Sequence, residues 1–256
     1  MASTNERGRF VWHELMTTDT AAALKFYQAV TGWTGQSWGE GVDYTVLNAN
    51  GSPVGGMMPI MGGGAGTSPR WIAYVEVPNV DETAALAAKL GGSVGMGPHS
   101  TPGVGRFASF TDPQGAIFAA ITSEAAMPPE GDPQRGQFSW RELVTTDYQA
   151  ADAFYRELFG WEKKSEFDMG PMGMYHMFGR DRFTYGGMFN KPASIAGGPY
   201  WLHYVQVDSA DAAAERAQKA GGTIVNGPME VPGGDRIAQI VDPQGATFAV
   251  HSKAGA

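Results

Sequence analysis

The chain has 256 residues, 36 of them Gly and none Cys, and its 18 basic and 26 acidic side chains give a formal net charge of −8. An acidic chain without a run of Lys or Arg lacks the electrostatic footprint of nucleic-acid-binding proteins, and its longest apolar runs are too short to span a bilayer. The absence of Cys excludes disulfides, thiolate nucleophiles and Cys-ligated zinc. We therefore expect a cytoplasmic globular protein that binds neither nucleic acid nor a membrane.

The first predicted elements follow from side-chain periodicity and helix caps. Residues 10–16 alternate as in a strand, Asp19 is a typical helix N-cap, and Gly32 follows the last residue with helical spacing. The rest of this half is predicted, in chain order, as strands at 43–48, 53–59 and 71–77, a helix at 81–90, and strands at 93–96, 106–111 and 116–122. The pattern strand, helix, two or three strands thus occurs twice and predicts an α+β fold.

An internal repeat sets the domain organisation. Residues 10–33 (FVWHELMTTDTAAALKFYQAVTGW) recur at 138–161 (FSWRELVTTDYQAADAFYRELFGW) with 13 of 24 positions identical, and the sequence DPQGA appears at both 112–116 and 242–246. A fixed-offset repeat of this length indicates a tandem duplication. The predicted organisation is a first domain at 8–122, a polar, Pro-rich linker at 123–136 and a second domain at 137–252.

Several short motifs carry a resemblance to a known family. They are Leu15-Met16-Thr17-Thr18-Asp19, Phe26-Tyr27, Gly32-Trp33, Gly91-Gly92 and Asp112-Pro113-Gln114-Gly115, with their copies in the second half. In this combination the chain resembles the vicinal oxygen chelate (VOC) superfamily of glyoxalases, bleomycin-resistance proteins and extradiol dioxygenases, and looks like its tandem two-domain, glyoxalase-like subgroup. The resemblance implies two tandem domains, each made of paired βαβββ modules that form a half-open barrel around a cavity.

The resemblance also implies four metal-ligand positions in each domain. In the first domain they fall on Trp12, 56–58, Ile72 and Ala119, and in the second on Trp140, 187–189, Leu202 and Ala249. None of these residues offers the nitrogen or oxygen ligand that zinc, iron, nickel or manganese requires. We therefore predict no metal at the family position, and no cofactor.

Strand alternation identifies the candidate site residues. Glu14 shares a strand face with Trp12, and Glu142 shares one with Trp140. A carboxylate beside Trp at low dielectric can act as a general acid or base, so Glu14 and Glu142 are the predicted catalytic residues. The predicted substrate-binding residues are Trp12, Met57 and Tyr74 of the first domain and Trp140, Met188, Tyr204 and His251 of the second. A structural role stays open for both glutamates, with an arginine such as Arg106 or Arg236, or a helix terminus, as the partner.

Three function classes fit these residues. The favoured one is a metal-independent enzyme that acts by acid–base chemistry on a small aromatic or hydrophobic molecule. The alternative is a non-catalytic, drug-sequestering protein of the bleomycin-resistance type, for which an apolar lining with a few polar groups suffices. A metal-dependent glyoxalase or dioxygenase is the second alternative. Two fused domains complete their modules within one chain, so both a monomer and a homodimer are compatible with the sequence.

Overall fold

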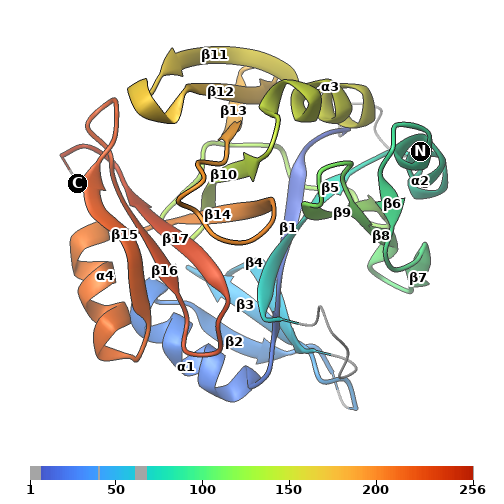
Figure 1. Cartoon of the computed structure of the whole chain (residues 1–256). Helices are drawn as coiled ribbons and strands as arrows, with labels where there is room; N and C mark the ends of the chain where they lie inside the picture. Colours follow the sequence, from blue (N-terminus) through green and yellow to red (C-terminus); the bar gives the residue numbers. More distant parts are fainter. Residues whose placement is uncertain (1–6, 40, 61–67, 256) are drawn as a thin grey trace. The chain divides into compact units, whose positions relative to one another are not determined.

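The computed structural model describes residues 7–39, 41–60 and 68–255, and it confirms the α+β class (Figure 1). The first copy contains β1 (Phe10–Thr17), α1 (Thr20–Thr31), β2 (Thr34–Ser37), β3 (Thr45–Ala49), β4 (Ser52–Pro59), β5 (Arg70–Glu76), α2 (Val80–Lys89), β6 (Ser93–Val94), β7 (His99–Thr101), β8 (Gly105–Thr111) and β9 (Ile117–Ser123). The second contains β10 (Phe138–Thr145), α3 (Tyr148–Phe159), β11 (Glu162–Asp168), η1 (Gly170–Met172), β12 (Met174–Arg180), β13 (Phe183–Asn190), β14 (Tyr200–Gln206), α4 (Ala210–Lys219), β15 (Thr223–Glu230), β16 (Arg236–Val241) and β17 (Thr247–Ser252). No helix within the described ranges has the length and apolar character needed to cross a bilayer.

The predicted helix ends are confirmed at atomic detail. The Asp19 carboxylate accepts from the Ala22 N–H, which satisfies one free donor of the first turn of α1. Gly32 ends the helix with a left-handed φ of 78°, and its N–H donates to the Gln28 carbonyl oxygen. Asp147 and Gly160 repeat both caps at α3, so the same local code starts and stops the equivalent helix in each copy.

Strands β1–β9 belong to one sheet and β10–β17 to another, and both sheets are open. The first module of each copy has the strand order β2-β3-β4-β1 or β11-β12-β13-β10, and the second has β5-β9-β8-β6 or β14-β17-β16-β15. Within each module the outer strands of this order are antiparallel, whereas β1 runs parallel to β4 and β5 parallel to β9. The order strand, helix, strands in each module is therefore the βαβββ arrangement that the sequence predicts.

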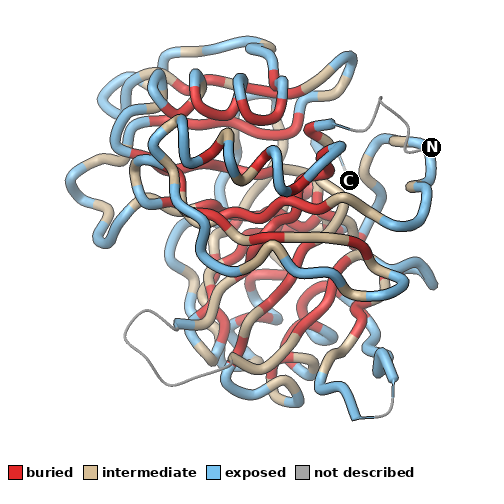
Figure 2. Tube along the Cα trace, turned by 90° about the vertical axis from the view of Figure 1, so that its right-hand side faces the viewer, coloured by how far each residue is buried: buried red, intermediate tan, exposed pale blue. Residues whose placement is uncertain are grey.

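Packing divides the chain into two compact units, whose boundaries fall inside β1, β5, β10 and β14. Unit 1 comprises the residues up to Val11, Ala73–Glu130 and Arg141–Trp201, and unit 2 comprises Trp12–Ile72, Gly131–Trp140 and Leu202–Ala256. Each unit thus combines one module of the first copy with one module of the second. Figure 2 shows buried stretches that follow the strands and exposed segments at the turns between them.

Each unit has its own apolar core. In unit 2, α1 packs against α4, and their buried faces meet around Phe26, Ala213 and Phe248. Figure 1 shows α4 lying along β15 and β16 in the same unit. The Arg216 guanidinium of α4 donates to the Ala29 and Val30 carbonyl oxygens, at 2.9 and 2.8 Å, near the C-terminus of α1. A cation at this end of a helix satisfies free carbonyls and complements the helix dipole.

A buried hydrogen-bonded network in unit 2 explains two of the repeated sequence motifs. The Tyr27 hydroxyl donates to Asp242 Oδ2 at 3.0 Å and accepts from Trp71 Nε1 at 2.8 Å. Asp242 Oδ1 accepts the N–H groups of the turn that follows it, including that of Ala246 at 2.8 Å. Burial, followed by the Asp242 charge, raises the pKa of Tyr27 well above its ordinary value, so the tyrosine stays a proton donor.

Unit 1 repeats this network with the copies exchanged. The Tyr155 hydroxyl donates to Asp112 Oδ2 at 3.0 Å and accepts from Trp201 Nε1 at 3.1 Å. The predicted turn after Asp112 is confirmed, because the Gly115 N–H donates to the Asp112 carbonyl oxygen at 3.1 Å. In each unit, therefore, the tyrosine of one copy holds the Asp-Pro-Gln-Gly turn of the other.

We expect Gly186→Ala to destabilise the fold by about 1–3 kcal/mol, the usual cost of an overpacked interior. Gly186 on β13 lies opposite Arg141 on β10, and a Cβ there would overlap the Arg141 carbonyl oxygen, a backbone atom that no rotamer change can move. The matched control is Gly198→Ala, because no described atom lies within 4 Å of a Cβ added at Gly198. Urea unfolding of both variants measures the difference; equal free energies of unfolding would contradict the prediction.

Candidate functional site

The first candidate site lies on β1 and β4, within unit 2. In their parallel register Glu14 is the partner of Gly56, and Leu15 is the partner of Met57. Neighbouring side chains of paired strands point to the same face, so the face that carries Glu14 meets a glycine on β4. The Glu14 side chain is buried, with 9% of the residue's surface exposed.

Tyr44 covers that glycine and joins the two predicted residues of this strand. Trp12 Nε1 donates to the Tyr44 hydroxyl at 2.8 Å, and the same hydroxyl is hydrogen-bonded to the Glu14 carboxylate. A Cβ at Gly56 would overlap the Tyr44 hydroxyl, so the glycine is what gives the tyrosine its position. Burial and then the Glu14 charge raise the pKa of Tyr44, which keeps its proton on the phenol oxygen.

The second copy has the same arrangement within unit 1. The Tyr175 hydroxyl donates to Glu142 Oε1 at 3.0 Å, and Glu142 is the register partner of Gly187. A Cβ at Gly187 would overlap the Tyr175 ring. The ring is stacked between Phe167 and Phe189, with centroids at 5.2 and 5.9 Å. We call the hydrogen-bonded pairs Glu14–Tyr44 and Glu142–Tyr175 the Glu–Tyr pairs.

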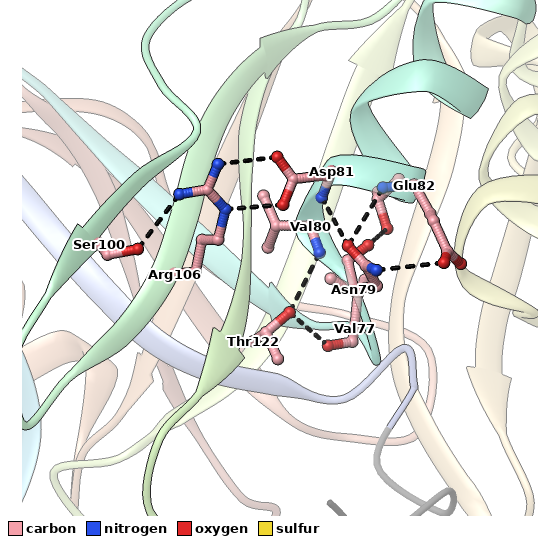
Figure 3. A network of polar contacts seen from close by, with 9 residues as sticks. Val77, Asn79, Val80, Asp81, Glu82, Ser100, Arg106 and Thr122 are labelled. Atoms are coloured by element: carbon pink, nitrogen blue, oxygen red, sulfur yellow. Dashed lines mark hydrogen bonds and ion pairs between the residues drawn. The ribbon is translucent and has the colours of Figure 1, made fainter.

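The hypothesis that Arg106 or Arg236 binds the glutamates is wrong, because each arginine is bound to an aspartate at the start of a helix. Arg106 Nε and Nη2 each donate to Asp81 at 2.7 Å, as Figure 3 shows. Arg236 makes the equivalent two hydrogen bonds to Asp211 at 2.6 and 2.7 Å. In Figure 3 the Asn79 cap and Thr122 fix the helix start that carries Asp81.

Met57 and Met188, two of the predicted binding residues, belong to the apolar cores. Both are fully buried, Met57 in the core of unit 2 and Met188 in the core of unit 1. Their register partners Leu15 and Leu143 are core residues as well, so the strand phase turns both methionines away from the glutamates. The register partner of each glutamate is the glycine one residue before the methionine in the chain, Gly56 for Glu14 and Gly187 for Glu142.

The other predicted binding residues lie on the second module of each copy. Tyr74 is buried and packs edge-on against Phe107, with ring centroids 6.1 Å apart. Tyr204 is buried, and its hydroxyl accepts from Gln239 Nε2 at 2.9 Å. Trp12 and Trp140 are half-buried.

His251 joins two residues that the sequence did not single out. Its Nδ1 lies 3.0 Å from Ser139 Oγ, and its Nε2 lies 2.8 Å from Asp235 Oδ2. All three residues belong to unit 2. Only His251 could be noticed from the sequence, through its lack of a counterpart in the first copy, because Ser139 and Asp235 meet it only through strand pairing.

The residues at the family's metal-ligand positions do not fit a metal. In the first copy, Ala119 faces Tyr74 in the β5–β9 register, and Tyr44 covers the glycine beside Glu14. In the second, Ala249 faces Tyr204. Among the described residues, no group of three or more His, Asp or Glu side chains is placed to hold a metal ion.

Comparison with known proteins agrees with this fold. The Glyoxalase/Bleomycin resistance protein/Dioxygenase superfamily matches residues 9–119 and 137–250. A Mycobacterium tuberculosis protein named "Putative glyoxylase CFP32" is 32% identical over 244 residues, which cover 93% of this chain and 92% of the relative. The anthracycline biosynthesis protein DauV of Streptomyces sp. is 30% identical over 259 residues, covering 95% of this chain and 92% of the relative.

Solved structures share the fold at low sequence identity. A Mn(II)-bound glyoxalase from Novosphingobium aromaticivorans has a TM-score of 0.62 at 19% identity, over 97% of this chain and 82% of that one. A homoprotocatechuate 2,3-dioxygenase variant from B. fuscum has a TM-score of 0.67 at 15% identity, over 97% of this chain and 72% of that one. The chain therefore belongs to the glyoxalase/bleomycin resistance protein/dioxygenase superfamily, as a member with two tandem domains.

Proposed function

We propose that this glyoxalase-like protein acts on a small, aromatic or hydrophobic organic molecule by acid–base chemistry, without a metal at the family position. The observation that carries the proposal is the Glu–Tyr pair, which occurs in both copies with a buried carboxylate beside a tyrosine hydroxyl. Glu14 and Glu142 are 9% and 8% exposed, and each accepts a hydrogen bond from its tyrosine. The apolar residues at the family's metal-ligand positions support the part of the proposal that excludes a metal there.

Each partner of a Glu–Tyr pair has a defined chemical role in this proposal. The carboxylate accepts a proton from an acidic C–H or O–H group of the substrate, and the phenol donates a hydrogen bond to the oxygen on which charge develops. In the first copy, the Trp12 indole holds the Tyr44 hydroxyl from its other side and presents an apolar ring. Acid–base catalysis of this kind contributes typically 10²–10⁴-fold to a rate.

The aromatic residues around the second-copy pair support the proposed substrate class. The Phe167, Tyr175 and Phe189 stack beside Glu142 favours a flat aromatic ligand, since offset aromatic contacts add to the burial energy. The name of the Streptomyces relative points to the same class, because anthracyclines are polycyclic aromatic compounds. We therefore place hydroxylated polycyclic quinones first among the molecules to test.

Turnover after metal removal tests the proposal. The protein, purified without a His tag and treated with a chelator, is incubated with hydroxynaphthoquinones and an anthracycline, and the products are identified by mass spectrometry. Conversion that persists after chelation supports the proposal. Conversion that stops on chelation and returns with Mn²⁺, Fe²⁺ or Zn²⁺ would overturn its metal-free part.

Ligand sequestration is the second candidate function. One observation favours it: the carboxylate and the hydroxyl of each Glu–Tyr pair are hydrogen-bonded to each other. Such a pair can orient a ligand without reacting with it. In that case the same compounds quench the tryptophan fluorescence in a saturable titration, and mass spectrometry recovers them unchanged. This result would replace the catalytic proposal by the binding one.

A further inference from the structure

We propose that Ser139, His251 and Asp235 form a nucleophilic serine relay in the second copy, with Ser139 reactive toward the acyl group of small esters. Ser139 Oγ lies 3.0 Å from His251 Nδ1, and His251 Nε2 lies 2.8 Å from Asp235 Oδ2. A nucleophile within hydrogen-bond reach of a base, which a third group orients in turn, is the geometry that activates a serine. The relay is separate from the Glu–Tyr pairs and adds a second reactivity to the protein.

The aspartate fixes the direction of proton transfer. A carboxylate only accepts hydrogen bonds, so Asp235 selects the histidine tautomer that carries its proton on Nε2. Nδ1 is then an acceptor and faces the Ser139 hydroxyl. The Ala254 N–H donates to the other oxygen of Asp235 at 2.9 Å and holds the carboxylate in place. Ser139 Oγ also lies 3.4 Å from the Tyr204 carbonyl oxygen, a longer contact than the one to His251.

The trio occurs in one copy only. At the equivalent positions of the first copy stand Val11, Gly105 and Ile121, whereas the arginine next to Asp235 is repeated as Arg106. A hydrogen-bonded support that the fold needs is expected in both copies, as the buried Tyr27–Asp242 and Tyr155–Asp112 networks are. The relay is therefore an addition to the shared framework and not a part of it.

His251 and Asp235 are both partly exposed to solvent. The His251 side chain is 16% exposed and that of Asp235 is 36% exposed, so the relay is accessible. Gln206 is the register partner of His251 on β14, and its Oε1 is buried without a hydrogen-bond partner among the described residues. Because unpaired buried acceptors are costly, an O–H or N–H group of a bound molecule is the natural partner for Gln206. The inferred substrate is a small ester that carries such a donor near its acyl group.

The reaction balances without any further reactant except water. Ser139 Oγ forms a bond to the acyl carbon while its proton passes to His251 Nδ1. The ester C–O bond breaks, and the leaving oxygen takes that proton from Nδ1. Water then attacks the acyl-serine, gives a proton to Nδ1, and Ser139 Oγ recovers it as the acid departs. The products are one carboxylic acid and one alcohol or phenol.

Covalent labelling by a fluorophosphonate tests the proposal without knowledge of the natural ester. Intact-mass analysis of the full chain is expected to show one added phosphonyl group, and peptide mapping is expected to place it on Ser139. His251→Gln should lower the labelling rate constant by about 10²-fold or more, the usual contribution of a general base. Ser37→Ala, in an exposed strand, serves as the matched control and should label at the rate of the unaltered protein.

The outcomes separate the relay from a structural hydrogen-bond chain. Label on Ser139 together with slow labelling of His251→Gln supports the proposal. No label on Ser139 of the unaltered protein, or an equal rate in His251→Gln, would overturn it. Mapping on the unaltered chain keeps the test valid even where a variant folds poorly. Hydrolysis of 4-nitrophenyl acetate with a burst of one phenolate per chain is the second readout, and its absence in Ser139→Ala is expected.

Discussion

Asp242→Ala is expected to lower the free energy of unfolding by about 3–5 kcal/mol, the range for removing one partner of a buried charged network. The carboxylate accepts the N–H groups of Gln244, Gly245 and Ala246 with one oxygen and the Tyr27 hydroxyl with the other. An alanine leaves the buried donors without an acceptor, and an unsatisfied buried donor costs about 1–3 kcal/mol. Because Tyr27 and Asp242 come from different copies, the loss also weakens the joint between α1 and the β16–β17 turn.

A graded set of variants separates this network from general sensitivity. Asp112→Ala makes the equivalent change in unit 1, where Tyr155 is the donor, and a similar loss is expected there. Tyr27→Phe should cost about 1 kcal/mol, the net value of a typical hydrogen bond. Asp208→Ala is the control, since its ion pair with Arg135 is exposed and worth little. Denaturant unfolding measures all four, and an Asp242→Ala loss no larger than that of Asp208→Ala would contradict the network.

The parts of the fold that depend on local sequence were predicted from it. Asp19 and Gly32 mark the ends of α1 to the residue, and the Asp112 turn forms as its residue types require. The missed strands are short or polar: β2 has four exposed residues, and β7 has three residues without apolar alternation. Such strands form because a neighbouring strand offers backbone partners, which is a property of the sheet and not of the segment.

Which modules pack together into each compact unit could not be predicted from the sequence. The repeat favours domains made of consecutive modules, whereas the compact units each take one module from each copy. What joins them is the contact between Tyr27 and Asp242 and its equivalent in unit 1, at sequence separations of 215 and 43 residues. The sequence shows both motifs but carries no signal that one binds the other.

Only part of the candidate site could be predicted. Alternation within one strand shows which of its residues share a face, but which residues of two strands lie opposite each other depends on how the strands pair. Alternation correctly joined Glu14 to Trp12, which Tyr44 now links in space. The sequence does not show which residues of β4 share the face of Glu14. The pairing of β1 with β4 places Gly56 beside Glu14 and leaves Met57 in the core. Tyr44 and Tyr175 are absent from the predicted site residues, because only the strand pairing shows that each lies over the glycine beside a glutamate.

Glu14→Gln and Glu142→Gln are expected to have the largest effect on turnover. If a Glu–Tyr pair supplies the base, the glutamine in its copy lowers kcat by about 10²–10⁴-fold, because an amide cannot take up the proton. Gln keeps the shape of Glu and still accepts the tyrosine hydroxyl, so the ligand dissociation constant and the thermal midpoint should change little. The two single variants and the double variant show whether one copy or both carry the reaction.

The matched Tyr44→Phe variant distinguishes catalysis from support. Removing the hydroxyl should lower kcat, because the hydrogen bond to the oxygen on which charge develops is lost. The pKa of Tyr44 is raised above its ordinary value of about 10, so deprotonation of this phenol produces no alkaline limb below pH 10. If Tyr44→Phe and Glu14→Gln lower the thermal midpoint and leave kcat unchanged, and the second-copy variants do likewise, the pairs are structural. The Trp12–Tyr44–Glu14 contacts would then serve to hold β1, β4 and the segment before β3 together, and the chemistry would belong to other residues.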